Sequence, residues 1–329
     1  MRSPTGAIVA SLLLVLAQPA VAAKREGAAK PAAVAKSEQF GSHERILQWI
    51  DGYRSDPEPE LVPDAVQAMS KLGLFKDLDT AGVFIGFVAG VLGDNQIKAE
   101  SLVARMFPMP PEDQAVIIKA IAYSGLPDWK ELLGKFVERM PARKVLIDQY
   151  LQGKAKVLKD LPLDSGPAPI DTLWGYYFAT ESFEPVQRII SALPWSEDKS
   201  DVNKLTIGSM AKWTLASNAA RDKGLLDLCR AELKHQPKEV ARPLKDVVEA
   251  AESYETGRIR KEAVAAIEEL KRRGPSKSTA WAWAAQAGST AIAVGCVVAS
   301  ATGHVELGLP CIVTGALSSA ATKLLGGTP

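Results

Sequence analysis

The 329-residue chain is long enough for one large core or two ordinary ones, and its 39 basic and 38 acidic residues give a net charge of +1. This balance lacks the basic excess typical of a nucleic-acid-binding protein, so no nucleic-acid partner is expected. The chain has 3 histidines and 3 cysteines, none of them at metal-site spacing, so we expect neither a metal nor a cofactor.

Residues 1–22 have the three-part pattern of a secretory signal peptide. Arg2 supplies the positive charge, residues 7–17 the apolar stretch, and Ala-Val-Ala at 20–22 the small residues of a cleavage site. A buried, uncleaved N-terminal helix is the alternative. Residues 23–41 are rich in Ala, Lys and Pro, which predicts a flexible leader. We therefore expect an exported protein of the bacterial periplasm or cell envelope.

From residue 43 onward the apolar residues recur at helical spacing. Val62, Val66 and Met69, for example, are separated by four and three residues, which places them on one helix face. Proline, glycine and aspartate interrupt the pattern at intervals of about one helix and a turn, and no convincing strand alternation occurs. The chain is therefore predicted to be all-α.

Several stretches follow one plan, in which a helix, a turn and a returning helix succeed one another. They lie at residues 63–92, 111–140, 170–193 and 205–233. Such helix-turn-helix pairs, stacked as an irregular α-solenoid, resemble the HEAT and tetratricopeptide architectures. The strict tetratricopeptide period is not met, so no family is assigned, and a compact helical bundle is the alternative.

Two stretches depart from this rhythm and suggest boundaries. Residues 153–169 contain three prolines and no helical face, which predicts a linker between a helical subdomain at 43–152 and a second at 170–235. Residues 236–273 are heavily charged with a narrow apolar stripe. They are interpreted as one or two long surface helices, broken near Gly257.

Three glycines, Gly82, Gly86 and Gly90, recur every four residues in a predicted helix at 79–92. This spacing removes every Cβ from one helix face, so another backbone can approach closely there. The uncharged stretch is too short to span a bilayer. A buried central helix is therefore predicted.

Aromatic side chains gather around residues 174–183, where they offer a candidate groove for an extended peptide or a glycan. The groove candidates are Trp174, Tyr176, Tyr177 and Phe183. The more common role of such residues is to anchor a core. The sequence contains no nucleophile elbow and no phosphate-binding loop, so no catalytic residue is assigned. A hydrolase using Glu181 or Glu184 near Trp174 stays open as an alternative.

The C-terminal segment 278–325 is the least charged part of the chain. Between Lys277 and Lys323 its one formal charge is Glu306, within a polar break that separates two apolar runs rich in Gly and Ala. This pattern predicts a helical hairpin buried in a bilayer or against protein. Tryptophans after a basic cluster, and glycines seven residues apart, suggest a membrane anchor. The anchor candidates are Trp281, Trp283, Gly288, Gly295, Gly308 and Gly315.

Cys296 and Cys311 fall on opposite arms of this hairpin, where a disulfide would join the arms. The alternative is that both, with Cys229, are small apolar fillers.

The sequence as a whole predicts an exported helical-repeat scaffold for protein–protein interaction, tethered to a membrane by its C-terminal hairpin. Its expected partners are other proteins and a membrane. A membrane-active, pore- or toxin-like protein that uses the hairpin is the first alternative, and the hydrolase is the second.

Overall fold

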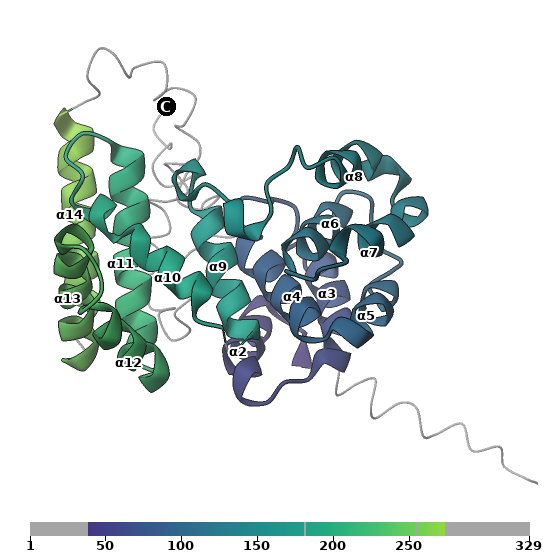
Figure 1. Cartoon of the computed structure of the whole chain (residues 1–329), viewed down its shortest axis with the longest axis horizontal. Coiled ribbons are helices and arrows are strands. Elements are labelled where there is room, and N and C mark those ends of the chain that lie inside the picture. The colour runs from purple at the N-terminus through teal and green to yellow at the C-terminus, as the bar shows by residue number, and fades with distance from the viewer. Residues whose placement is uncertain (1–38, 181, 254–255, 274–329) are drawn as a thin grey trace, which may run out of the picture. The chain divides into compact units, whose positions relative to one another are not determined.

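The computed structural model describes residues 39–180, 182–253 and 256–273 (Figure 1). Helices are the only regular secondary structure in these ranges, which confirms the all-α class. The predicted signal peptide at 1–22, nearly all of the leader at 23–41 and the hairpin at 278–325 lie outside the described residues. So do all the membrane-anchor candidates and both cysteines of the candidate disulfide.

The described residues form α-helices connected by short turns and 3₁₀ segments. The α-helices are α2 (His43–Gly52), α3 (Val62–Lys71), α4 (Gly82–Asp94), α5 (Ala99–Arg105), α6 (Gln114–Tyr123), α7 (Trp129–Lys135), α8 (Lys144–Leu151), α9 (Ala168–Ala179), α10 (Glu184–Ser191), α11 (Val202–Ala219), α12 (Lys223–Glu232), α13 (Lys238–Glu252) and α14 (Thr256–Arg273). The 3₁₀ segments are η1 (Tyr53–Ser55), η2 (Pro59–Leu61), η3 (Gln96–Lys98), η4 (Val137–Arg139), η5 (Pro141–Arg143), η6 (Leu158–Asp160), η7 (Leu163–Ser165) and η8 (Leu193–Glu197).

Helix ends follow the local chemistry of the sequence. Gly73 adopts a left-handed φ of 73° directly after α3. Its N–H donates to Ser70 O and that of Leu74 donates to Met69 O, each at 2.9 Å, so the last carbonyls of α3 are satisfied by a glycine cap. At the start of α11 the Asp201 side chain accepts hydrogen bonds from the backbone N–H groups of the first turn. α13 ends at Glu252 and α14 begins at Thr256, so Gly257, near which a break is predicted, is the second residue of α14.

The centre of the core is the contact between α4 and α9. A Cβ atom built on Gly86 would lie 1.9 Å from the carbonyl oxygen of Thr172, and one built on Gly175 would lie 2.0 Å from that of Val83. Gly82 similarly faces the backbone of Ala168, at 2.7 Å. Real Cβ atoms do not approach other atoms so closely, so only glycine allows the two backbones to meet here. The close approach predicted for the glycine series is therefore confirmed, and α9 contributes a glycine to it.

The other faces of α4 are also covered. α6 packs against it, and the aromatic rings of Trp49 and Tyr53 meet the Phe87 ring at centroid distances of 5.2 and 4.9 Å. Residues 82–92 are buried without exception. This confirms the prediction of a buried central helix.

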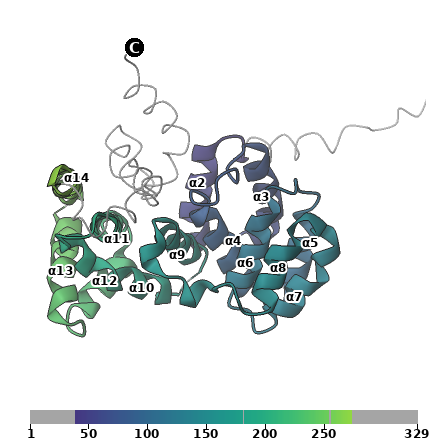
Figure 2. The ribbon, with the colours of Figure 1, turned by 90° about the horizontal axis from the view of Figure 1, so that it is seen from above.

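Residues 153–169 do not divide the core. α4 precedes this segment and α9 follows it, yet the two helices pack on each other, and one hydrophobic cluster runs from Phe40 to Ile259. Farther along the chain, α11 packs against η8, α12, α13 and α14 (Figure 2). None of the helices within the described ranges combines the length and the apolar character needed to cross a membrane.

We predict that Gly86→Ala lowers the free energy of unfolding by more than about 3 kcal/mol or prevents folding, because the added methyl overlaps the Thr172 carbonyl. Urea denaturation followed by circular dichroism measures this. Gly134→Ala is the matched control, because Gly134 is an exposed position in α7 and a Cβ added there would have no other atom within 4 Å. That substitution is expected to raise stability by about 0.5–1 kcal/mol. A Gly86→Ala protein as stable as the unmodified chain would contradict the described packing.

Candidate functional site

The four aromatic groove candidates do not share one surface. Trp174 and Tyr177 are each 1% exposed, and the indole Nε1 of Trp174 donates to Thr214 Oγ1 at 2.9 Å. These two side chains are core anchors. Phe183 is 37% exposed and directly precedes α10. Tyr176 lines a cavity that the other three candidates do not line.

The hydroxyl of Tyr177 belongs to a polar cluster that joins three parts of the chain. It donates to Asp222 Oδ2 at 2.6 Å, and the Arg54 guanidinium forms an ion pair with the same oxygen while lying 4.3 Å from the centre of the Tyr177 ring. The second oxygen, Oδ1, accepts from the N–H of Leu225 at 3.1 Å and so caps α12. The cluster therefore fastens η1, α9 and the start of α12 together.

Burial alone would favour the neutral acid form of Asp222. The hydrogen bonds from Tyr177 and Leu225 and the charge of Arg54 outweigh it, so the pKa of Asp222 is lowered. Burial, supported by the hydrogen bond to Asp222, raises the pKa of Tyr177, which stays protonated. The cluster connects three elements through its hydrogen bonds and ion pair, which gives it a structural role.

The cavity beside Tyr176 is the main candidate site, and we call it the groove. Its volume is about 420 Å³, and its walls come from the end of α6 and the turn after it, from η6, from α9 and from the start of α10. The groove is lined by Ala122, Tyr123, Gly125, Leu126, Pro127, Trp129, Val157, Leu158, Lys159, Leu173, Tyr176, Ser182, Glu184, Pro185 and Arg188. Most of these are apolar, and the charged members are Lys159, Glu184 and Arg188.

One wall of the groove is formed by residues 157–159, which belong to a connecting segment, 153–167, that we call the strap. Arg188 on α10 donates to the carbonyl oxygens of Leu158 and, at 2.6 Å, Leu161. Burial lowers the pKa of Arg188. On the opposite side of the groove, the Tyr176 hydroxyl donates to Ser124 O at 3.2 Å. Two polar side chains of the groove, Arg188 and Tyr176, thus contact main-chain oxygens.

The groove is lined by few polar side chains. Among the described residues that line it, Glu184 is the one carboxylate, whereas glycoside hydrolysis commonly uses a pair. Glu181, the other acid of the hydrolase alternative, lies outside the described residues. Across the described ranges no group of three or more His, Cys, Asp or Glu side chains is placed to hold a metal ion. The groove is suited to binding apolar groups with a few polar contacts.

Cys229 on α12 is free and buried, and burial raises the pKa of its thiol to about 12. Such a thiol is unreactive and fills space in the core.

Sequence reasoning missed the strap and its anchor. In the sequence, Arg188 has the pattern of an ordinary solvent-exposed charge on an amphipathic helix. Its carbonyl partners are 27 and 30 residues away along the chain, so no local pattern indicates the contact. The density of aromatic residues in the sequence is the signal that marks the region of Tyr176, whose side chain lines the groove.

Comparison with known proteins adds no family. No protein-family model matches the chain, and neither the curated proteins nor the solved structures give a match. The function is therefore argued from the residues alone.

We predict that Asp222→Asn lowers the free energy of unfolding at pH 7 by about 1–3 kcal/mol, because a charged acceptor shared by Arg54 and Tyr177 is lost. The folded-state pKa of Asp222 is depressed, so its contribution is complete above the unfolded-state value of about 3.9 and disappears as the pH falls through the folded-state value. Denaturation curves of the two proteins should therefore converge in acid.

The control is Asp227→Asn, which affects an exposed carboxylate of α12 paired with Arg230 on the surface. Its effect is expected to be below about 0.5 kcal/mol. Equal losses in the two variants would show that the Asp222 cluster is not an anchor.

Proposed function

We propose that this protein is an exported helical scaffold that binds protein partners in the groove and is tethered to a membrane by its C-terminal segment. The export and tethering parts rest on the signal-peptide pattern at 1–22 and on the weakly charged segment 278–325. The binding part rests on the groove.

The groove is the single observation that carries the proposal. Its apolar lining comes from segments that are far apart in the sequence, and it lies between helices that are fixed by the buried core. A preformed apolar hollow of about 420 Å³ with charged groups among its lining residues suits the apolar side chains of an extended polypeptide segment. Because the walls of the groove are already fixed by the core, the protein loses little conformational entropy when a partner binds.

The proposal includes an irregular α-solenoid arrangement of helix pairs. Support comes from α6 with α7, α9 with α10, and α11 with α12, since the members of each pair are consecutive in the chain and pack on each other. Stacked pairs of this kind present extended surfaces to partners.

Val157→Glu tests the groove. Val157 is a half-buried lining residue, so a carboxylate there must be desolvated when an apolar segment binds. Partners of the tagged full-length protein are crosslinked in the producing cells and identified by mass spectrometry, and the affinity of each is then measured with purified proteins. We expect Val157→Glu to weaken binding about tenfold or more.

Val145→Glu is the matched control, because Val145 on α8 is 75% exposed and does not line the groove. It should bind as the unmodified chain does, and both variants should melt at the same temperature. A partner that binds both variants equally would refute the groove as the binding surface.

Deletion of residues 275–329 tests the tether. The full-length protein is expected to remain with membranes after high-salt and carbonate washing, and the truncated protein to be released. Release of the full-length protein by the same washes would refute the tether. Leakage of dye-filled vesicles caused by the purified full-length chain would instead favour the pore- or toxin-like alternative.

A further inference from the structure

A second cavity is also lined by residues of the strap. Its volume is about 180 Å³, and its walls come from the turn before α4, from α4, from α6, from the strap and from the start of α9. The cavity is lined by Leu78, Asp79, Ile85, Lys119, Tyr123, Leu161, Ser165, Gly166, Pro167, Ala168, Pro169 and Thr172. Most of these side chains are apolar. Among the described residues lining this cavity, Lys119 is the only cation and Asp79 the only anion.

Lys119 is an unusual side chain in this position. It lies on α6, whose neighbouring residues are almost all buried, and it is itself half-buried. Its amine makes no hydrogen bond or ion pair with any described residue. Burial in the apolar wall lowers the pKa of Lys119, and the negative charge of Asp79 offsets this only in part. The neutral amine, which is the nucleophilic form, is therefore more populated than in an exposed lysine.

Tyr123 supplies a second functional group to the cavity. Its hydroxyl oxygen accepts a hydrogen bond from the Tyr150 hydroxyl at 3.1 Å, which leaves the proton of Tyr123 free to be donated elsewhere. Burial raises the pKa of Tyr123, so this proton is retained at neutral pH. A carbonyl oxygen in the cavity would thus find a donor in the same small space as the amine.

We propose that Lys119 is a nucleophilic amine that captures small aldehydes or ketones as an imine within this cavity. The neutral Nζ attacks the carbonyl carbon, the C=O π bond breaks toward oxygen, and one proton passes from the nitrogen to that oxygen to give a neutral carbinolamine. Loss of one water molecule then forms the C=N bond, with no net oxidation or reduction. The step needs only the carbonyl compound, and the limited volume restricts it to small ones. This inference is independent of the protein-binding function of the groove.

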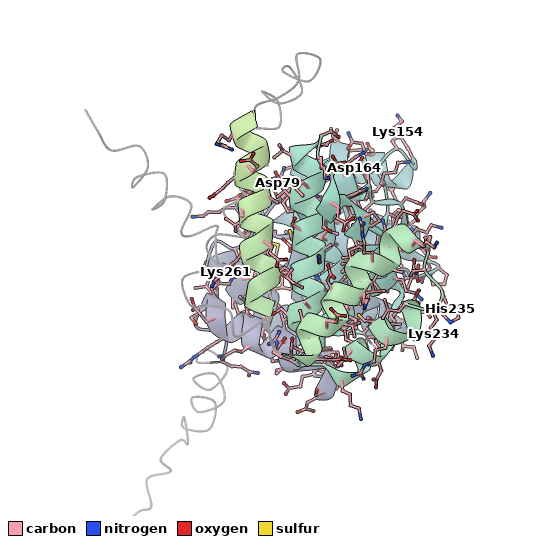
Figure 3. The ribbon with its side chains drawn as sticks, turned by 90° about the vertical axis from the view of Figure 1, so that its left-hand side faces the viewer. Asp79, Lys154, Asp164, Lys234, His235 and Lys261 are labelled. Carbon is pink, nitrogen blue, oxygen red and sulfur yellow. The ribbon has the colours of Figure 1, made fainter. Side chains whose placement is uncertain are left out.

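The experiment uses the full-length protein, propanal and cyanoborohydride at pH 7, which reduces any imine to a stable secondary amine. Peptide mapping by mass spectrometry then gives the rate at each lysine. The exposed side chains of Lys154, Lys234 and Lys261, labelled in Figure 3, are internal references. We expect Lys119 to react at least about twofold faster than each of these lysines, because burial lowers its pKa and so raises the fraction of neutral amine. A rate at Lys119 equal to or below that of the references overturns the proposal.

Two carboxylate variants test whether the negative charge of Asp79 controls the rate at which Lys119 reacts. Asp79→Asn removes the charge that favours the ammonium form, so the rate at Lys119 should rise by about twofold or more. Asp164→Asn is the matched control, because Asp164 is an exposed residue of the strap that does not line the cavity (Figure 3). It should leave the rate unchanged, and Lys119→Arg should abolish the adduct at this position. Equal rates at Lys119 in the two carboxylate variants would refute the assigned role of Asp79 and with it the proposal.

Discussion

The fold depends on the direct contact of two helix backbones. α4 and α9 approach so closely that Gly86 and Gly175 each face a carbonyl oxygen of the other helix. Glycine in a helix costs about 1 kcal/mol relative to alanine, so these helices are weak by themselves. Their stability must come from the dispersion contacts that the close approach permits, and those contacts exist only once the two helices have met. The core is therefore a product of long-range pairing, and the strap and both cavities lie along the chain that connects the two helices.

A second constraint is the large number of short helices. The C-terminal end of every helix leaves carbonyl groups without partners in the helix, and short helices and their turns have many such carbonyls per residue. Arginine side chains contact carbonyls in the short helices and turns: Arg105 donates to Glu60 O, Arg139 to Ala104 O, and Arg143 to Pro111 O. These three arginines thus join segments about 30 to 45 residues apart.

Local features of the fold were readable from the sequence, because they depend on neighbouring residues. The helical periodicity, the proline and glycine boundaries and the Gly82–Gly86–Gly90 face all follow from spacing within one element. The helix that packs on this face could not be predicted in the same way. A single glycine such as Gly175 forms no repeating pattern, and α9 lies far from α4 along the chain. For the same reason 153–169 looked like a linker, although the helices on both sides share one core.

The candidate site shows the same limit at the level of single residues. Tyr176 and Tyr177 are adjacent and chemically alike, yet Tyr176 lines the groove and Tyr177 is buried against Arg54 and Asp222. The density of aromatic residues in the sequence identifies the region. The orientation of α9 then decides which of the two tyrosines lines the groove and which is buried. Lys119 was invisible for another reason, since one lysine in an apolar helix is ordinarily interpreted as a solvated side chain.

Arg188 holds the strap through main-chain oxygens, and this has an evolutionary consequence. Carbonyl groups are the same at every residue, so the strap can exchange its side chains without losing its anchor. The floor of the groove, by contrast, includes Leu173 and Tyr176 on α9, which packing against α4 constrains. The side chains of the strap can therefore change during evolution, whereas packing on α4 constrains Leu173 and Tyr176. Related proteins built on this scaffold would be expected to change their ligands by altering residues such as Val157 and Lys159, with the helical framework left intact.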